Sequence, residues 1–216
     1  MDFVRQEVLA GSLRPGDKLP TERELAAQLD ISRNSVREGL RVLENLGVLS
    51  STQGSGNYIA LNFDDTISEA LSFLYYLRGM QESDVTEFRW MIEREALELS
   101  VQRITSGQKK RLWQELERLE SAKSEEERIR SDKELHKVIV QASANDFLIA
   151  SYQALTAFMD RYISTMRQRI IRGMMGNNKL EESHRLLVEG LIEGNLVKAQ
   201  QGLENHFGYI EQYRHL

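Results

Sequence analysis

Cysteine is absent from this chain of 216 residues. Its absence excludes disulfide bonds, thiolate metal sites and cysteine nucleophiles, and it fits a reducing compartment. Long apolar runs are lacking too, since none approaches the roughly 18 residues of a membrane span. The first residues do not have the form of a signal peptide. We therefore expect a cytoplasmic protein with no membrane partner.

An excess of positive charge is also lacking. The chain carries 28 Lys and Arg against 33 Asp and Glu, which gives a net charge of −5. This balance excludes a uniformly basic nucleic-acid binder. Hydrophobic residues make up 41% of the chain and charged residues 28%, an ordinary mix for a globular protein that buries a core.

Proline is scarce and is confined to one short segment that holds Pro15 and Pro20. Six of the 14 glycines lie in the first 60 residues, so turns are also concentrated there. A long stretch without proline favours helix, because nothing interrupts the backbone hydrogen bonds. The expected fold is therefore mostly α. It has a turn-rich N-terminal domain over residues 1–60, a linker over 61–66 and an all-helical domain over 67–216.

The N-terminal domain contains the start and stop signals of two short helices. Thr21 and Glu24 have the spacing of a capping box, and the helix they begin ends near Asp30. Ser32 is a good N-cap for a second helix, which Gly47 ends. Two short helices separated by a brief turn indicate a helix-turn-helix.

Two short apolar segments follow these helices. Residues 48–51 and 57–60 can pair as strands around a glycine-flanked tip at residues 52–56. This hairpin predicts the wing of a winged helix-turn-helix.

The second of the two helices carries the residues that suit DNA recognition. Arg33 and Arg37 lie one turn apart near its start, and arginine can bind guanine with two hydrogen bonds. Ser32 and Asn34 can contact bases or phosphates. The first 60 residues carry seven basic against eight acidic residues, so an alternative is a small helical cap with arginines on its surface. The placement of the arginines favours DNA binding.

The rest of the chain predicts seven helices. They span residues 66–79, 83–104, 106–122, 124–143, 146–173, 178–193 and 196–214. The expected N-caps are Thr66, Ser83, Ser106, Ser124 and Asn145.

Three of the four histidines each interrupt an apolar helix face: His136, His184 and His206. Asp132 precedes His136 by four residues, so both side chains leave the same face of a helix. An acid and an imidazole at this spacing can chelate one metal ion. Burial of an ionisable group costs several kcal/mol unless it is paired or coordinated. The residues alone leave two interpretations open, separate hydrogen-bonded core histidines or one shared metal site.

Three segments of the N-terminal domain resemble the GntR family of bacterial winged-helix transcription regulators. They are residues 13–26 (LRPGDKLPTERELA), residues 32–38 (SRNSVRE) and the predicted wing, residues 54–59 (GSGNYI). Gly39 departs from the family, which usually has alanine there.

The resemblance implies contacts with a double-stranded DNA operator from the arginines and from the wing tip. Together with the polar residues named above, the predicted DNA-binding set is Arg23, Ser32, Arg33, Asn34, Arg37, Gln53 and Gly54.

Residues 66–216 resemble the FCD effector domain of the FadR subfamily. Residues 89–97 (RWMIEREAL) are similar to its Arg-x-x-(apolar)-Glu segment, and residues 132–136 (DKELH) to its Asp-x-x-Phe-His motif. Two further histidines match its other ligand positions. The resemblance implies a metal set made of Asp132, His136, His184 and His206. Ser183 stands where a glutamate commonly precedes the third ligand.

Three neutral imidazoles and one carboxylate suit Zn²⁺, Ni²⁺ or another borderline divalent ion more than Ca²⁺ or Mg²⁺. A small carboxylate or sugar-acid effector could fill an open coordination position. The resemblance places Arg89 near this pocket, where it could pair with the effector carboxylate. The alternative for Arg89 is a salt bridge to Glu93, four residues on.

These observations predict a ligand-responsive transcription regulator, not an enzyme, with no catalytic residues. It would bind a palindromic operator as a homodimer, since the symmetry of an operator mirrors that of the protein. One alternative is a metal-dependent enzyme, because such a site can activate water. Another is a sensor of the metal ion itself.

Overall fold

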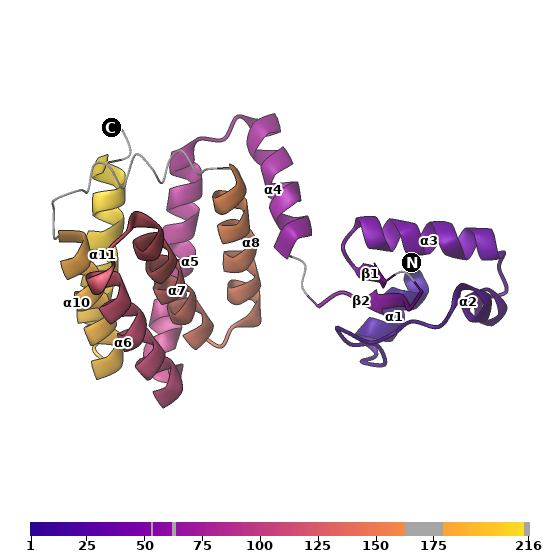
Figure 1. Cartoon of the computed structure of the whole chain (residues 1–216), viewed down its shortest axis with the longest axis horizontal. Coiled ribbons are helices and arrows are strands. Elements are labelled where there is room, and N and C mark those ends of the chain that lie inside the picture. The colour runs from indigo at the N-terminus through magenta and orange to yellow at the C-terminus, as the bar shows by residue number, and fades with distance from the viewer. Residues whose placement is uncertain (53, 62–63, 163–178, 214–216) are drawn as a thin grey trace. The chain divides into compact units, whose positions relative to one another are not determined.

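The computed structural model describes residues 1–52, 54–61, 64–162 and 179–213 (Figure 1). The chain divides into two compact units, Met1–Ala70 and Leu71–Leu216. The expected fold class is confirmed, since the described elements are helices and one small two-stranded sheet.

The first unit is a winged helix-turn-helix. Its elements are α1 (Asp2–Leu9), α2 (Glu22–Leu29), α3 (Arg33–Asn45), β1 (Leu49–Thr52) and β2 (Gly56–Ile59). The two strands pair antiparallel, with Leu49 opposite Ile59 and Thr52 opposite Gly56. The predicted wing is therefore present.

Side-chain caps fix where α2 and α3 begin. The Thr21 hydroxyl accepts a hydrogen bond from the Glu24 backbone N–H at 3.3 Å, and the Glu24 carboxylate accepts one from the Thr21 N–H at 2.8 Å. The Ser32 hydroxyl accepts from the Ser35 N–H at 3.1 Å. Between the helices, Asp30 adopts a left-handed conformation with φ of 54°, which a short polar side chain tolerates. The predicted caps are confirmed, and they set the turn between the two helices.

The helices that follow form a bundle. Their bounds are α4 (Asp64–Arg78), α5 (Glu82–Arg103), α6 (Ser106–Ser121), α7 (Glu125–Ala142), α8 (Asp146–Tyr162), α10 (Lys179–Glu193) and α11 (Leu196–Tyr213). Helix α4 begins inside the predicted linker of residues 61–66, and the boundary between the two units falls within it. The predicted continuation of α8 beyond Tyr162 lies outside the described residues.

Three predicted caps are wrong. Thr66 lies inside the first turn of α4, which begins at Asp64. Thr105, not Ser106, caps α6, because its hydroxyl accepts from the Gln108 N–H at 3.3 Å while the Gln108 side chain accepts from the Thr105 N–H. Ser83 lies inside the first turn of α5, which follows Gln81. The caps predicted at Ser124 and Asn145 are confirmed, since each side-chain oxygen accepts a backbone hydrogen bond.

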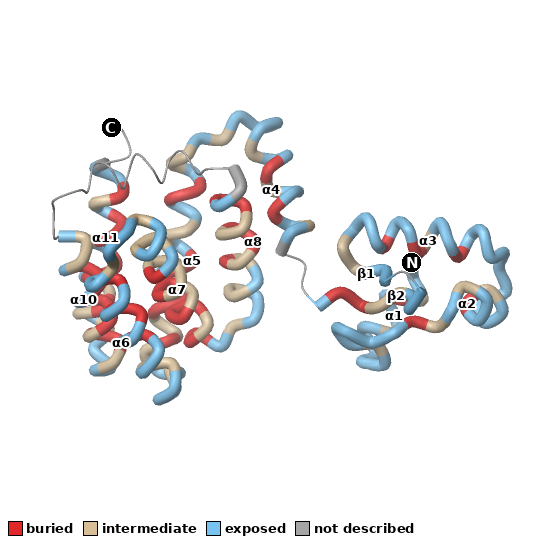
Figure 2. The backbone as a smooth tube through the Cα atoms, viewed as in Figure 1, coloured by how far each residue is buried: buried red, intermediate tan, exposed pale blue. Residues whose placement is uncertain are grey.

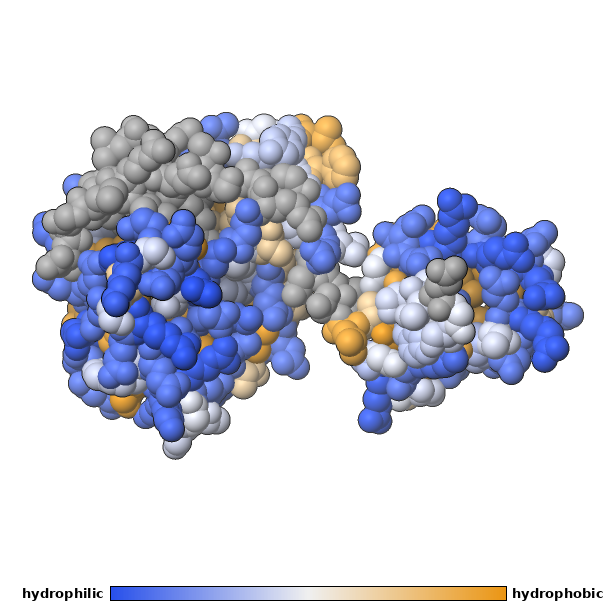
Figure 3. Space-filling model, in the orientation of Figure 1, coloured by the Kyte–Doolittle hydropathy of each residue, from blue (hydrophilic) through white to orange (hydrophobic). Residues whose placement is uncertain are grey.

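Helix α5 is central to the bundle. It contacts α7, α8, α10 and α11, and Figure 1 shows α8 on one side of it and α11 on the other. Buried leucines from five helices form the main core, among them Leu97, Leu112, Leu135, Leu187 and Leu203. Figure 2 shows the buried residues on the facing sides of the helices, and the face of this unit seen in Figure 3 is mainly hydrophilic. No helix of the described chain is long and apolar enough to cross a membrane.

Helices α10 and α11 pack closely at two glycines. A Cβ atom at Gly190 would lie 2.4 Å from the Ala199 backbone nitrogen, and one at Gly202 would lie 2.4 Å from the Leu187 nitrogen. Neither backbone atom can move without separating the helices. The absence of side chains at these two positions therefore permits the close approach.

Gly190→Ala should lower the free energy of unfolding by about 1–3 kcal/mol, the usual cost of overpacking a close-packed core. The matched control is Gly208→Ala on α11, because a Cβ at Gly208 meets nothing within 4 Å. The control should keep the wild-type stability or gain up to about 1 kcal/mol from helix propensity. Urea denaturation measures both, and equal stabilities of the two variants would contradict the packing argument.

Candidate functional site

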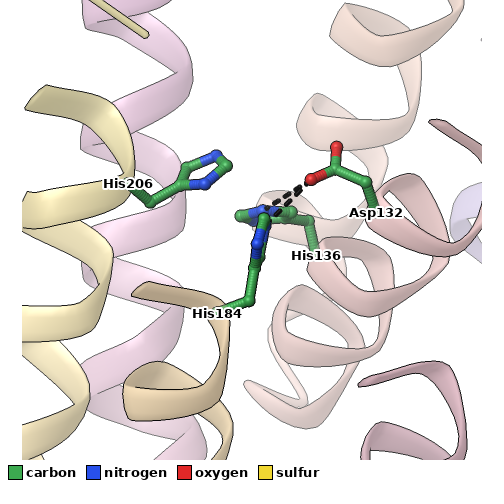
Figure 4. Close-up of side chains that lie close together, drawn as sticks. All are labelled: Asp132, His136, His184 and His206. Atoms are coloured by element: carbon green, nitrogen blue, oxygen red, sulfur yellow. Dashed lines mark ion pairs between the residues drawn. The ribbon is translucent and has the colours of Figure 1, made fainter. Parts of the chain in front are cut away.

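Four side chains that could hold a metal ion converge inside the bundle (Figure 4): Asp132, His136, His184 and His206. Helix α7 supplies Asp132 and His136, which lie one helical turn apart. Helices α10 and α11 supply His184 and His206. The structure thus brings together all four of the residues predicted as metal ligands.

The close packing of α10 and α11 explains how two of these histidines meet. His184 is three residues before Leu187, and His206 is four residues after Gly202, the glycine that touches Leu187. Each histidine is therefore about one turn from the point of closest approach, and both project to the same side. Their ring centroids lie 4.6 Å apart.

The distances are those of one shared centre. One potential ligand atom from each residue lies within 4.8 Å of the others. Two atoms bound to one ion at about 2.1 Å are at most about 4.2 Å apart, so the four side chains would have to move inward to share one ion. The His184 Nε2 atom lies 2.9 Å from Asp132 Oδ1 without the alignment of a hydrogen bond, and His136 Nε2 lies 3.8 Å from the same oxygen.

Buried polar atoms without partners show that the residues fit a metal ion. Among the described residues, His136 Nε2 and both ring nitrogens of His184 and His206 have no hydrogen-bond partner. The three rings are at most 2% exposed. Unsatisfied buried nitrogens are costly, and coordination of a shared ion would satisfy one on each ring.

Electrostatics favour a cation here. Burial opposes ionisation of Asp132, but the neighbouring His184 and His136 outweigh it and hold the pKa of Asp132 well below its usual value. Burial is the main reason that the pKa of His206 lies well below its ordinary 6.5, and the nearby His136 and His184 lower it further. The carboxylate is therefore ionised and His206 neutral at pH 7, which are the forms that bind a metal ion.

A second carboxylate, from Glu93 on α5, lies behind the predicted ligands. Glu93 Oε2 is 2.5 Å from His136 Nδ1, and Glu93 Oε1 accepts a hydrogen bond from Arg89 Nε at 2.5 Å. Burial raises the pKa of Glu93, but the Arg89 charge and His136 outweigh it, so the net shift is downward. The contact between Glu93 and His136 was not predicted from the sequence, since the two residues lie 43 positions apart.

Two roles were predicted for Arg89, a contact with the effector and a salt bridge to Glu93. The salt bridge to Glu93 is present. Its side chain is 14% exposed, and its guanidinium lies 5.4 Å from the centre of the Phe207 ring. Contact between Arg89 and an effector stays a prediction.

In the first unit, five of the predicted DNA-binding residues are exposed: Arg23 on α2, Ser32 at the start of α3, and Arg33, Asn34 and Arg37 on α3. Arg37 also pairs with Glu22 of α2, with Nε 3.4 Å from a carboxylate oxygen. Gly54 lies at the wing tip with φ of 77°, and a Cβ there would meet nothing within 4 Å. Gln53 lies outside the described residues.

Two known protein families match the two parts of the chain. Residues 2–59 match the bacterial regulatory proteins of the gntR family, and residues 84–209 match the FCD domain. The chain belongs to the gntR-family transcription regulators that carry an FCD domain. The match to the FCD domain includes Glu93 and all four predicted metal ligands.

Two curated relatives of this FCD protein are similar along most of their length. A candidate regulatory protein of the L-lactate dehydrogenase operon of Escherichia coli K12 is 29% identical over 97% of this chain and 82% of its own length. The HTH-type transcriptional regulator LutR of Bacillus subtilis is 26% identical over 93% of each chain. The solved structure of a GntR protein of Streptococcus agalactiae aligns with a TM-score of 0.73 at 24% identity, over 98% of this chain and 96% of that one.

If the four residues hold a metal ion, His184→Ala should remove most of it, because one of four ligands is lost. The matched control is His215→Ala, which changes a histidine outside the predicted set and should leave the metal content unchanged. Metal affinity of the wild type should fall as the pH drops through the histidine range, since a protonated imidazole cannot coordinate. Elemental analysis of the purified proteins measures the content, and full occupancy in His184→Ala would rule out the shared site.

Proposed function

We propose that the chain is a cytoplasmic, ligand-responsive transcription regulator of the FadR subfamily. As a homodimer it binds a palindromic operator through its winged helices, and its FCD domain senses a small organic acid through a bound divalent metal ion. The observation that carries the proposal is the buried convergence of Asp132, His136, His184 and His206.

The donor set points to the class of metal. Three imidazoles and one carboxylate favour Zn²⁺ or Ni²⁺ over Ca²⁺ or Mg²⁺. When bound, the ion would supply positive charge and open coordination positions to the pocket. The chain would hold it through one oxygen of Asp132 and one ring nitrogen of each histidine. Arg89 would provide a second cationic anchor at the edge of the same site.

The name of one relative supports an organic acid as effector. The Escherichia coli relative is named for an L-lactate dehydrogenase operon. L-Lactate is a small hydroxy acid, and its carboxylate and hydroxyl oxygens can chelate one ion. A hydroxy acid or sugar acid of this kind therefore suits a metal ion with open positions, and an anion is favoured over a neutral or cationic ligand.

An exposed apolar face on α4 supports the homodimer. Phe73, Tyr76 and Leu77 are 63%, 64% and 82% exposed. Apolar groups of this size that gather on a surface mark sites of association. Pairing of two such faces would bring two winged helices to one operator, whose two half-sites would then be related by the same two-fold axis.

Two other functions compete with this one. An enzyme would need a base beside the metal, but the nearby Glu93 is held by both Arg89 and His136 and is not free to take a proton from water. A sensor of the metal ion itself would release the operator on metal addition alone. Turnover of a candidate substrate would favour the enzyme.

Arg33→Ala and Arg37→Ala should each weaken operator binding by about 1–3 kcal/mol if the arginine contacts a guanine. The matched control is Arg41→Ala, which changes an arginine further from the start of α3. The first residues of a recognition helix contact the base edges, so this control should lose less operator affinity and keep the wild-type base preference. Titration of labelled operator at fixed salt measures the loss. Wild-type affinity in both of the first two variants would refute the assignment.

A small organic acid should raise the melting temperature of metal-loaded protein and change its operator affinity, because ligands stabilise the state that they bind. Coupling between two such sites is typically about 5- to 150-fold in affinity. Neither effect should survive chelation of the metal. The measurement is an operator titration with L-lactate and with related acids, on metal-free and metal-loaded protein. An equal shift in both forms would place the effector elsewhere, and release by metal alone would favour the metal sensor.

A further inference from the structure

The two ring nitrogens of His136 lie in different surroundings. The Nδ1 atom is 2.5 Å from the Glu93 carboxylate. The Nε2 atom faces the shared centre and has no hydrogen-bond partner among the described residues. His184 and His206 form no ring hydrogen bond within the described part of the chain, although His184 Nε2 lies 2.9 Å from Asp132 Oδ1. Of the three rings, His136 alone has a nitrogen in a hydrogen bond.

This contact selects one tautomer of the ring. An ionised carboxylate only accepts hydrogen bonds, so the nitrogen that faces Glu93 must carry the proton. A neutral imidazole carries one proton, and Nε2 is then left with a free lone pair. Metal-bound histidines in proteins commonly donate their other N–H to a carboxylate, which fixes both the tautomer and the ring orientation.

Arg89 completes the arrangement. Its Nε–H donates to the other oxygen of Glu93, so the carboxylate is held at both oxygens and cannot rotate. Its permanent charge also balances that of Glu93, whose side chain is 1% exposed.

We propose that Glu93 and Arg89 are positioning residues that hold His136 in its Nδ1-protonated form and so preset its Nε2 lone pair toward the metal. This inference rests on the proposed metal site. It gives the Arg89–Glu93 pair a role that does not require contact with the effector.

The unaltered protein provides the first test. The chain has four histidines, so ¹⁵N spectra of the imidazole rings are simple, and His136→Gln assigns the His136 signals. In metal-free wild-type protein at pH 8, His136 should carry its proton on Nδ1, and Zn²⁺ should shift its Nε2 signal. A ring protonated mainly on Nε2 would overturn the proposal without any variant of Glu93.

The second test is Zn²⁺ affinity, measured by competition with a coloured chelator at fixed pH. Glu93→Gln should lose about 10- to 100-fold, the usual effect of removing such a partner. In this variant the amide oxygen of the new glutamine should turn toward Arg89, so its NH₂ group faces His136 Nδ1. Nδ1 must then accept a hydrogen bond, and the ring proton moves to Nε2, the nitrogen that should bind the metal. Glu93→Gln combined with Arg89→Met frees the amide to turn its oxygen toward His136 and should recover part of the lost affinity. If Glu93→Gln lost affinity only because the fold was damaged, the double variant should bind Zn²⁺ more weakly than the single variant.

Glu115→Gln is the matched control. Glu115 is a buried carboxylate paired with Arg118 at 2.7 Å, on a helix that supplies no predicted ligand, and its variant should bind Zn²⁺ like the wild type. Wild-type affinity in Glu93→Gln, or an equal loss in Glu115→Gln, would overturn the inference and leave the metal site standing. Wild-type protein that binds no metal would overturn the proposed function and this inference together.

Discussion

The helical unit depends on how it accommodates ionisable groups inside an apolar core. Glu93, His136, His184 and His206 are at most 2% exposed, and Asp132 is only partly accessible. Burial of such groups costs several kcal/mol each unless opposite charges or ligands compensate. Arg89 balances one carboxylate, and a bound cation would balance the other. The leucine core around them supplies the stability that allows these groups to be buried and excludes the water that would otherwise compete for them.

Much of this arrangement could be predicted from the sequence because local signals specify it. Capping boxes and a proline-free chain predict the helices within a few residues, and the helical periodicity places Asp132 and His136 on one face. The misplaced cap at Ser106 shows the limit of local rules, since both Thr105 and Ser106 carry hydroxyls. Gln108, three residues after Thr105, decides between them by completing the capping box.

The contact between Glu93 and His136 could not be predicted in this way. It joins α5 to α7 across 43 residues, and no periodicity within either helix encodes which of its neighbours a carboxylate will meet. The spacing of Arg89 and Glu93 predicts their salt bridge, but the second oxygen of Glu93 acquires its partner only through packing. The convergence of the three histidines likewise needed either the family resemblance or the fold, because the residues alone left separate core histidines as an alternative.

The glycine contacts between α10 and α11 have a consequence for how the site adapts to ions of different size. Gly190 and Gly202 lock those helices together, so the spacing of His184 and His206 is nearly fixed. The spacing of Asp132 and His136 is set by one turn of α7. Each of the two pairs of residues is thus held by a rigid backbone, whereas the spacing between the pairs is not. If the site holds an ion, a change in ionic radius is expected to move α7 relative to the α10–α11 pair.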